Sequence, residues 1–145
     1  MTTLIGNPKA TYEYTIIDTY IAGIVLSGTE VKSLRAGNAS ISDSYCLFEN
    51  NELFIRHMHI KEFMQIKHTN HEPYQDRKLL LKRQELNKIL KVIKEKGLTI
   101  IPLSVMLSET GYMKVKIATC KGKKNYDKRE SIKLRDLNKE SKNIK

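Results

Sequence analysis

The feature that most constrains the fold of this chain is a change of pattern between Met113 and Arg129. Met113, Val115 and Ile117 alternate with lysines, which is typical of a strand with one face on a core and the other in solvent. After Cys120 this alternation stops, and basic residues surround a single aromatic side chain. The sequence therefore predicts a core strand followed by a basic segment with too few apolar residues to pack.

The net charge is divided at the same place. The whole chain carries a net charge of +10, and residues 114–145 hold 12 Lys and Arg against 4 Asp and Glu, a net charge of +8. A cationic terminus of this kind attracts polyanions. We therefore expect a domain over residues 1–120 and a basic C-terminal tail over residues 121–145 that is disordered when free.

The length and composition favour a single domain. A chain of 145 residues with 40% hydrophobic residues can bury a core without disulfides or a metal ion. Cys46 and Cys120 lie in apolar or alternating runs, so we expect reduced core cysteines. No apolar run approaches the ~20 residues of a membrane span, and the N-terminus lacks the pattern of a signal peptide. We expect a soluble, cytoplasmic monomer with no membrane contact.

The first third of the chain predicts a long strand and a short helix. Residues 12–26 are rich in Tyr, Thr, Ile and Val, and Gly23 suggests a bend or a bulge in this strand. The S-x-x-E sequence at 27–30 is a capping box, and Gly37 suits the end of a helix. We therefore expect a helix over about residues 28–36.

A hairpin and a loop are predicted next. Residues 44–48 and 53–60 are apolar-rich segments, and Asn50-Asn51 between them tolerates the positive φ of a tight turn. Residues 65–77 are polar and without periodicity, which indicates a surface loop.

The last third predicts a helix and a strand before the segment described first. Residues 78–81 return the chain to the core, and residues 82–96 carry apolar side chains at i, i+3, i+4 and i+7 with Gly97 as the stop. Residues 98–107 alternate as a strand in which Pro102 indicates an edge position or a bulge.

These elements define the fold class. About six strands in hairpin-like order with two or three helices predict a mainly β protein, a small antiparallel β-barrel of the oligonucleotide-binding (OB) type with a basic C-terminal tail. The residues before position 10 are assigned only a turn or an extended segment. A β-sandwich is the structural alternative.

Signatures of enzymes and of metal sites are scarce. The sequence has no phosphate-binding glycine loop, nucleophile elbow or C-x-x-C pair, so we expect no catalysis and no cofactor. His57 and His59 alternate onto one strand face, and His68 and His71 lie in the loop. Because no acidic or thiol partners cluster nearby, we expect no metal ion at either pair of histidines. We expect His57 and His59 on the barrel surface, and His68 and His71 in a solvated turn.

Two other functions remain open at this point. A different RNA-binding barrel, such as a ribosomal protein or an initiation-type factor, would share the basic tail. A nucleic-acid-processing enzyme would require clustered carboxylates or a His-Asp pair, which the sequence does not display.

Five motifs, in order, resemble one known family. They are G-T-E-V-K-S-L-R-A-G at 28–37, D-S-Y at 43–45, R-K-L-L-L at 77–81, E-K-G-L at 95–98, and K-G-K-K at 121–124 with Y-D-K-R at 126–129. This arrangement is similar to the bacterial SsrA-binding protein family, also called small protein B, and the similarity extends from about Asn7 to Arg135.

The resemblance implies a partner and a process. Members of that family bind the tRNA-like domain of transfer-messenger RNA through an OB barrel. They act in trans-translation, the rescue of ribosomes stalled on messages that lack a stop codon. The tail is implied to enter the ribosome decoding centre and the empty message channel.

The resemblance also implies site residues. Asn7, Leu80 and Lys114 correspond to the family's RNA-contacting positions, while Ile21 and Pro8 stand where the family has an acidic residue and an arginine. The full set of RNA-binding residues expected on the barrel is Asn7, Lys9, Tyr12, Leu80, Lys114 and Lys116. The ribosome-contacting residues expected in the tail are Lys121, Gly122, Lys123, Lys124, Tyr126, Asp127, Lys128 and Arg129.

Each of these residue types suits a particular kind of contact with RNA. Lysines neutralise phosphates, and an aromatic ring such as Tyr126 stacks on an exposed base. Leu80 offers apolar contact to unstacked loop bases, although its place in an apolar run also allows plain core packing.

Overall fold

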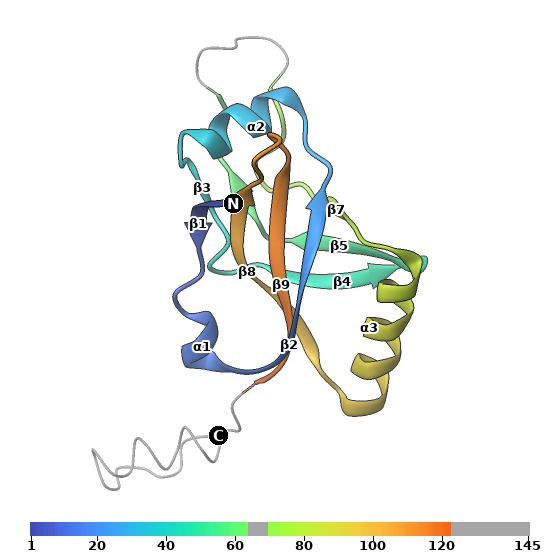
Figure 1. Cartoon of the computed structure of the whole chain (residues 1–145). Helices are drawn as coiled ribbons and strands as arrows, with labels where there is room; N and C mark the ends of the chain where they lie inside the picture. Colours follow the sequence, from blue (N-terminus) through green and yellow to red (C-terminus); the bar gives the residue numbers. More distant parts are fainter. Residues whose placement is uncertain (64–69, 123–145) are drawn as a thin grey trace, which may run out of the picture.

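The fold is a closed antiparallel barrel in a computed structural model that describes residues 1–63 and 70–122. Its six strands are β2 (Tyr14–Ile24), β4 (Tyr45–Glu49), β5 (Glu52–Arg56), β7 (Arg77–Leu80), β8 (Thr99–Leu107) and β9 (Met113–Gly122). They follow the order β8-β4-β5-β7-β2-β9, and the pairing of β8 with β9 closes the ring (Figure 1). The predicted OB-type barrel is confirmed, and the sandwich alternative is wrong because β8 and β9 join the two ends of the sheet.

Shorter elements surround this barrel. The additional strands are β1 (Thr2–Gly6), which pairs with β8, and β3 (Ala39–Ser40), which pairs with β6 (His59–Ile60). The helices are α1 (Ala10–Glu13), α2 (Gly28–Arg35) and α3 (Arg83–Lys96). Figure 1 shows α2 at one end of the barrel, with α1 and the end of β9 at the other. Within residues 1–63 and 70–122, none of the helices has the length and hydropathy to cross a membrane.

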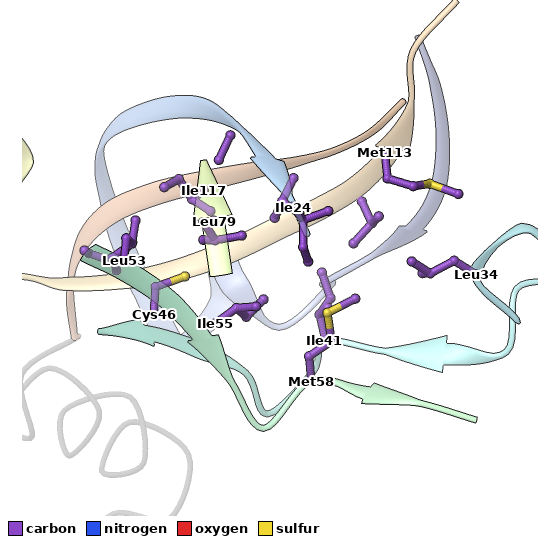
Figure 2. Close-up of a cluster of buried hydrophobic side chains, with 14 of the residues drawn as sticks. Ile24, Leu34, Ile41, Cys46, Leu53, Ile55, Met58, Leu79, Met113 and Ile117 are labelled. Carbon is purple, nitrogen blue, oxygen red and sulfur yellow. The ribbon is translucent and has the colours of Figure 1, made fainter. Parts of the chain in front are cut away.

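The core fills the inside of the ring with aliphatic side chains (Figure 2). Leu53, Ile55 and Ile117 are fully buried there, as the alternation of their strands requires. Cys46 and Cys120 are free and buried, as predicted. Burial raises the pKa of the Cys120 thiol to about 11, so this side chain is a small core hydrophobe rather than a nucleophile.

Local sequence signals account for several boundaries. The Ser27 N–H donates to Glu30 Oε1 at 2.8 Å and the Glu30 N–H donates to Ser27 Oγ at 3.4 Å, which is the predicted capping box of α2. Gly37 follows α2 with a φ of 79°, as expected for a helix stop. Asn50 and Asn51 both have positive φ in the β4–β5 turn, as predicted.

A buried ion pair joins α2 to β7. Glu30 and Arg77 are 1% and 2% exposed, and Arg77 Nε donates to Glu30 Oε2. Arg77 also donates to the carbonyl oxygens of Met58 and Pro73. Because one guanidinium bonds to three separate segments, it determines where α2 lies above the end of the barrel.

The predicted strand over residues 12–26 is wrong at its start. Tyr12 and Glu13 lie in α1, where their backbone N–H groups donate to Lys9 O at 3.1 and 2.9 Å. The turn is stabilised because Ala10 is buried against Ile101 and Cys120, a tertiary contact that the β-rich composition could not reveal.

The bulge of β2 also lies elsewhere than predicted, between Ile16 and Asp18 rather than at Gly23. For β8, the bulge predicted at Pro102 is confirmed.

Two predictions about histidines are also wrong. His57 adopts a φ of 67°, which ends β5 at Arg56, so His57 and His59 do not share one strand face. His71 is only 7% exposed, because its Nε2 donates to Ile60 O at 2.8 Å and its Nδ1 lies 2.8 Å from the Thr29 hydroxyl. His68 lies outside the described residues.

Candidate nucleic-acid interface

The strand register places Leu80 and Lys114 on one outer face of the barrel. Gly23 of β2 pairs with Leu80 of β7 on one side and with Lys114 of β9 on the other. Directly paired residues point to the same side of a sheet. Their chain neighbours Leu79 and Val115 are 1% and 0% exposed, so Leu80, Gly23 and Lys114 face outward.

A second row of residues extends this face. Ile21 of β2 pairs with Lys116 of β9, which pairs in turn with Ser104 of β8. Since Ile21 and Lys116 lie two residues from Gly23 and Lys114, both rows point the same way. We call this surface the β2–β9 face, and it consists of Ile21, Gly23, Leu80, Ser104, Lys114 and Lys116.

The β2–β9 face exposes apolar side chains that a barrel would otherwise bury. Leu80 is 49% exposed and Ile21 is 44% exposed, so plain core packing of Leu80 is wrong. A Cβ at Gly23 would lie 3.4 Å from the Leu80 Cβ, which means that Leu80 rests against the backbone of Gly23. Because Gly23 has no side chain, no side chain stands between the exposed Leu80 and Lys114 on this face.

The two lysines of this face are available for phosphate groups. Lys114 and Lys116 are half-buried and lie ~7 Å apart along β9, two residues at the rise of a strand. Across the part of the chain that the structure describes, neither lysine takes part in an ion pair, whereas Lys78 is paired with Glu52 at 3.1 Å. Two uncompensated cations beside exposed apolar side chains suit RNA with unstacked bases.

Asn7 connects the N-terminal segment to this region. Its backbone N–H donates to Leu103 O and its Nδ2 donates to Pro102 O, both at 2.9 Å. Because a carbonyl only accepts, these bonds set the orientation of the amide, and they leave Oδ1 buried without a hydrogen-bond partner among the described residues. Gly6, just before Asn7, pairs with Ser104, and Ser104 pairs with Lys116, so Gly6 and Lys116 are ~10 Å apart across two strand spacings.

Lys9 and Tyr12 belong to a different part of the surface. Lys9 precedes α1, and Tyr12 on α1 is 77% exposed. A hollow of about 270 Å³ lies beside α1 and is lined by Lys9, Glu13 and Asp43 among others. The structure thus gathers Leu80, Lys114 and Lys116 and leaves Lys9 and Tyr12 at the α1 end of the barrel. Asn7 lies between the two groups, because it follows the strand that pairs with β8 and also lines the hollow beside α1.

The root of the tail also lies at the α1 end. β9 continues through Lys121 and Gly122, which pair with Thr15 and Tyr14 directly after α1. Lys123, Lys124, Tyr126, Asp127, Lys128 and Arg129 lie outside the described residues.

Sequence reasoning did not assign Gly23 and Ser104 to the site. The signal for Ser104 was present, because it alternates with the core residues Val105 and Leu103 on the strand beside Lys116. Gly23 could not be assigned, since its effect depends on pairing with both Leu80 and Lys114, which are 57 and 91 positions away.

Comparisons with known proteins point to one family. A protein-family model described as SmpB protein matches residues 4–145. The chain is 50% identical over 139 residues to an SsrA-binding protein of Flavobacterium psychrophilum, covering 96% of this chain and 93% of that one. It is 51% identical over 141 residues to an SsrA-binding protein of Cytophaga hutchinsonii, covering 97% and 92%.

A solved structure shares the fold. It is described as "tmRNA-SmpB: a journey to the center of the bacterial ribosome", and its matching chain superposes with a TM-score of 0.73 at 39% identity. The match covers 94% of this chain and 97% of the other.

Proposed function

The chain belongs to the SmpB protein family, and from this premise we propose that it binds the tRNA-like domain of transfer-messenger RNA and delivers it to stalled ribosomes for trans-translation. The proposed role is binding and delivery rather than catalysis. Two relatives of about 50% identity are named for binding SsrA, and the superposed chain comes from work on transfer-messenger RNA, SmpB and the ribosome.

The observation that carries this proposal is the convergence of Leu80, Lys114 and Lys116 on the β2–β9 face. Residues 80 and 114 are far apart in sequence, yet both pair with Gly23. Lysines supply salt-dependent attraction to phosphates, and exposed Leu80 and Ile21 supply apolar contact to unstacked bases.

The proposal assigns a second task to the basic tail. Residues 123–145 follow a strand that ends beside α1, so Lys9 and Tyr12 are close to the point where the tail leaves the barrel. We infer that the tail contacts the decoding centre and the empty message channel through Tyr126, Asp127, Lys128 and Arg129. The α1 end of the barrel would then face the ribosome while the β2–β9 face holds the RNA.

A gel-shift titration tests the RNA partner. The full chain should bind the tRNA-like half of transfer-messenger RNA more tightly than an ordinary tRNA at each of several salt concentrations. Leu80→Ala should remove part of this preference, since it deletes apolar contact without changing charge. Equal affinity for the two RNAs at every salt concentration would contradict the proposal.

A further inference from the structure

Three aromatic rings, those of His57, His59 and Tyr74, line a hollow away from the β2–β9 face, and a fourth ring, Tyr45, contacts His57. Tyr45 stacks beside His57 with ring centroids 5.5 Å apart, and His59 contacts Tyr74 with centroids 4.8 Å apart. The hollow has a volume of about 290 Å³ and is lined by Ser40, Asp43, His57, His59 and Tyr74. We call it the ring notch. In the order of the ring, β4 and β5 lie opposite β2 and β9, so the notch and the β2–β9 face are separate surfaces.

The rings of the notch are accessible to a partner. Tyr74 is 62% exposed and Tyr45 is 37% exposed. His57 reaches Tyr45 only because its backbone takes a φ of 67°, a conformation that residues other than glycine seldom adopt. The backbone that ends β5 therefore also completes one wall of the notch.

The charge around the notch is opposite in sign to that of the whole chain. Asp43 lines the hollow and forms no ion pair within the described residues. Arg56 of β5 is already held by Asp76 at 2.9 Å and by Glu49 at 3.5 Å. With histidine counted as neutral, Asp43 is the one charged residue in the lining of the hollow, and it also borders the hollow that Lys9 lines, whereas the whole protein carries a net charge of +10.

We propose that the ring notch binds an arginine side chain from a basic segment of a partner protein. A guanidinium is planar and cationic, so it can stack on the Tyr74 ring while its N–H groups donate to the Asp43 carboxylate. Lysine carries the same charge but lacks the flat surface, so arginine should bind better.

RNA and metal ions fit the notch less well. Phosphate groups need cations, and the free charge in this hollow is the Asp43 carboxylate. Across residues 1–63 and 70–122, no three His, Cys, Asp or Glu side chains are grouped to hold a metal ion. The excess charge of the protein lies mainly in residues 114–145, so residues 1–113, with a net charge of +2, repel a basic segment little.

The test is an NMR titration of the full chain with short peptides. The probe is Gly-Gly-Arg-Gly-Gly, compared with counterparts that carry lysine or the neutral citrulline, and with a single-stranded RNA octamer. We expect the arginine peptide to shift the ring signals of Tyr74 and His59, the lysine peptide to bind more weakly, and the citrulline peptide to leave the signals unchanged. These comparisons use the unmodified protein, so they do not depend on the folding of a variant.

Variants then locate the binding. Tyr74→Ala should weaken arginine-peptide binding by roughly 2- to 30-fold, the range expected for a lost cation–π contact. Asp43→Asn should weaken it by at least about tenfold, as expected for a lost hydrogen bond to a charged group. The matched control is Tyr112→Ala, which removes a tyrosine that is 69% exposed on the turn before β9 and should change nothing. Tyr74→Ala should also keep its affinity for the tRNA-like domain, which separates this inference from the proposed function.

Three results would overturn the inference. The citrulline peptide could bind as well as the arginine peptide, the ring signals could remain unchanged, or the RNA octamer could shift them while the peptide does not. The last result would identify the notch as an RNA contact instead.

Discussion

At the residue scale, the interface depends on side chains that remain outside the barrel although their neighbours are buried. Leu80 follows Leu79, and Lys114 and Lys116 flank Val115, so the period of two decides which of them can meet a ligand. Leu80 was the ambiguous case, because a run of three leucines does not show which one faces out. The pairing with Gly23 settles its direction.

Replacing Lys114 with alanine should weaken binding to the tRNA-like domain and flatten its salt dependence. One lost phosphate contact lowers the slope of log affinity against log salt by ~0.7–0.9. The control is Lys88→Ala on α3, an exposed lysine away from the β2–β9 face, which should keep the slope. An unchanged slope for Lys114→Ala would remove this residue from the interface.

Replacing Ile21 with glutamate should leave the fold intact and change RNA affinity. Ile21 is 44% exposed and pairs with Lys116, so a carboxylate there has a cross-strand cation and no buried site to disturb. We expect a melting temperature within a few degrees of the parent and an affinity changed by about 1 kcal/mol or more, as for a charged hydrogen bond. A binding isotherm that matches the parent would place the RNA contact elsewhere.

At the element scale, a buried ion pair between Glu30 and Arg77 connects α2 to β7. Burial alone would raise the pKa of Glu30, but the Ser27 N–H, the Arg77 guanidinium and the Gln75 amide together hold this pKa below its ordinary value of 4.5. A carboxyl group with a lowered pKa in the folded state stabilises the fold above the unfolded pKa and loses this contribution as the pH falls through the folded pKa.

The predicted consequence is a loss of stability in acid that depends on Glu30. The free energy of unfolding should fall as the pH drops below about 4.5, and Glu30→Gln should flatten that part of the curve while lowering stability at pH 7. Urea titrations at several pH values measure both effects. Identical acid dependence in the parent and in Glu30→Gln would show that other carboxylates cause the loss.

Elements with strong local signals were predictable from the sequence, and those that depend on distant contacts were not. The capping box of α2, the Asn50-Asn51 turn and the amphipathic α3 each carry their signal within a few residues. α1 forms inside a β-rich run because Ala10 meets Ile101 and Cys120. The buried His71 was read as a solvated turn because its partner Thr29 lies 42 positions away.

The same distinction applies to the candidate site. Alternation alone placed Lys114 and Lys116 on one strand face, and resemblance to a family supplied Leu80 and Asn7. The register through Gly23, the buried Asn7 Oδ1 and the ring notch depend on contacts between segments far apart in the chain, which the sequence does not show.

At the scale of the whole molecule, the surfaces are distributed around the barrel. The β2–β9 face lies across the ring from β4 and β5, and the tail leaves at the α1 end (Figure 1). In the function proposed above, this arrangement would let the side of the barrel hold an RNA while the C-terminus reaches a second partner.

Deleting residues 123–145 should separate the two tasks. β9 ends at Gly122, so the deletion leaves every strand pair of the barrel in place. Affinity for isolated transfer-messenger RNA should stay within a few fold of the parent, while tagging on stalled ribosomes should be lost. Alanine at Asp127, Lys128 and Arg129 together should have the same effect. A truncated chain that lost RNA binding and kept tagging would reverse the assignment.

The central claim is that the β2–β9 face holds the RNA. Its most direct test compares variants on opposite sides of the barrel by their dissociation constants for the tRNA-like domain. The double variant Leu80→Ala/Lys114→Ala removes an exposed apolar side chain and one cation from the β2–β9 face, and Tyr74→Ala removes an aromatic ring from the ring notch. We predict that the double variant weakens binding at least about tenfold, or ~1.4 kcal/mol, while Tyr74→Ala binds like the parent. Undiminished binding by the double variant with weakened binding by Tyr74→Ala would contradict the account.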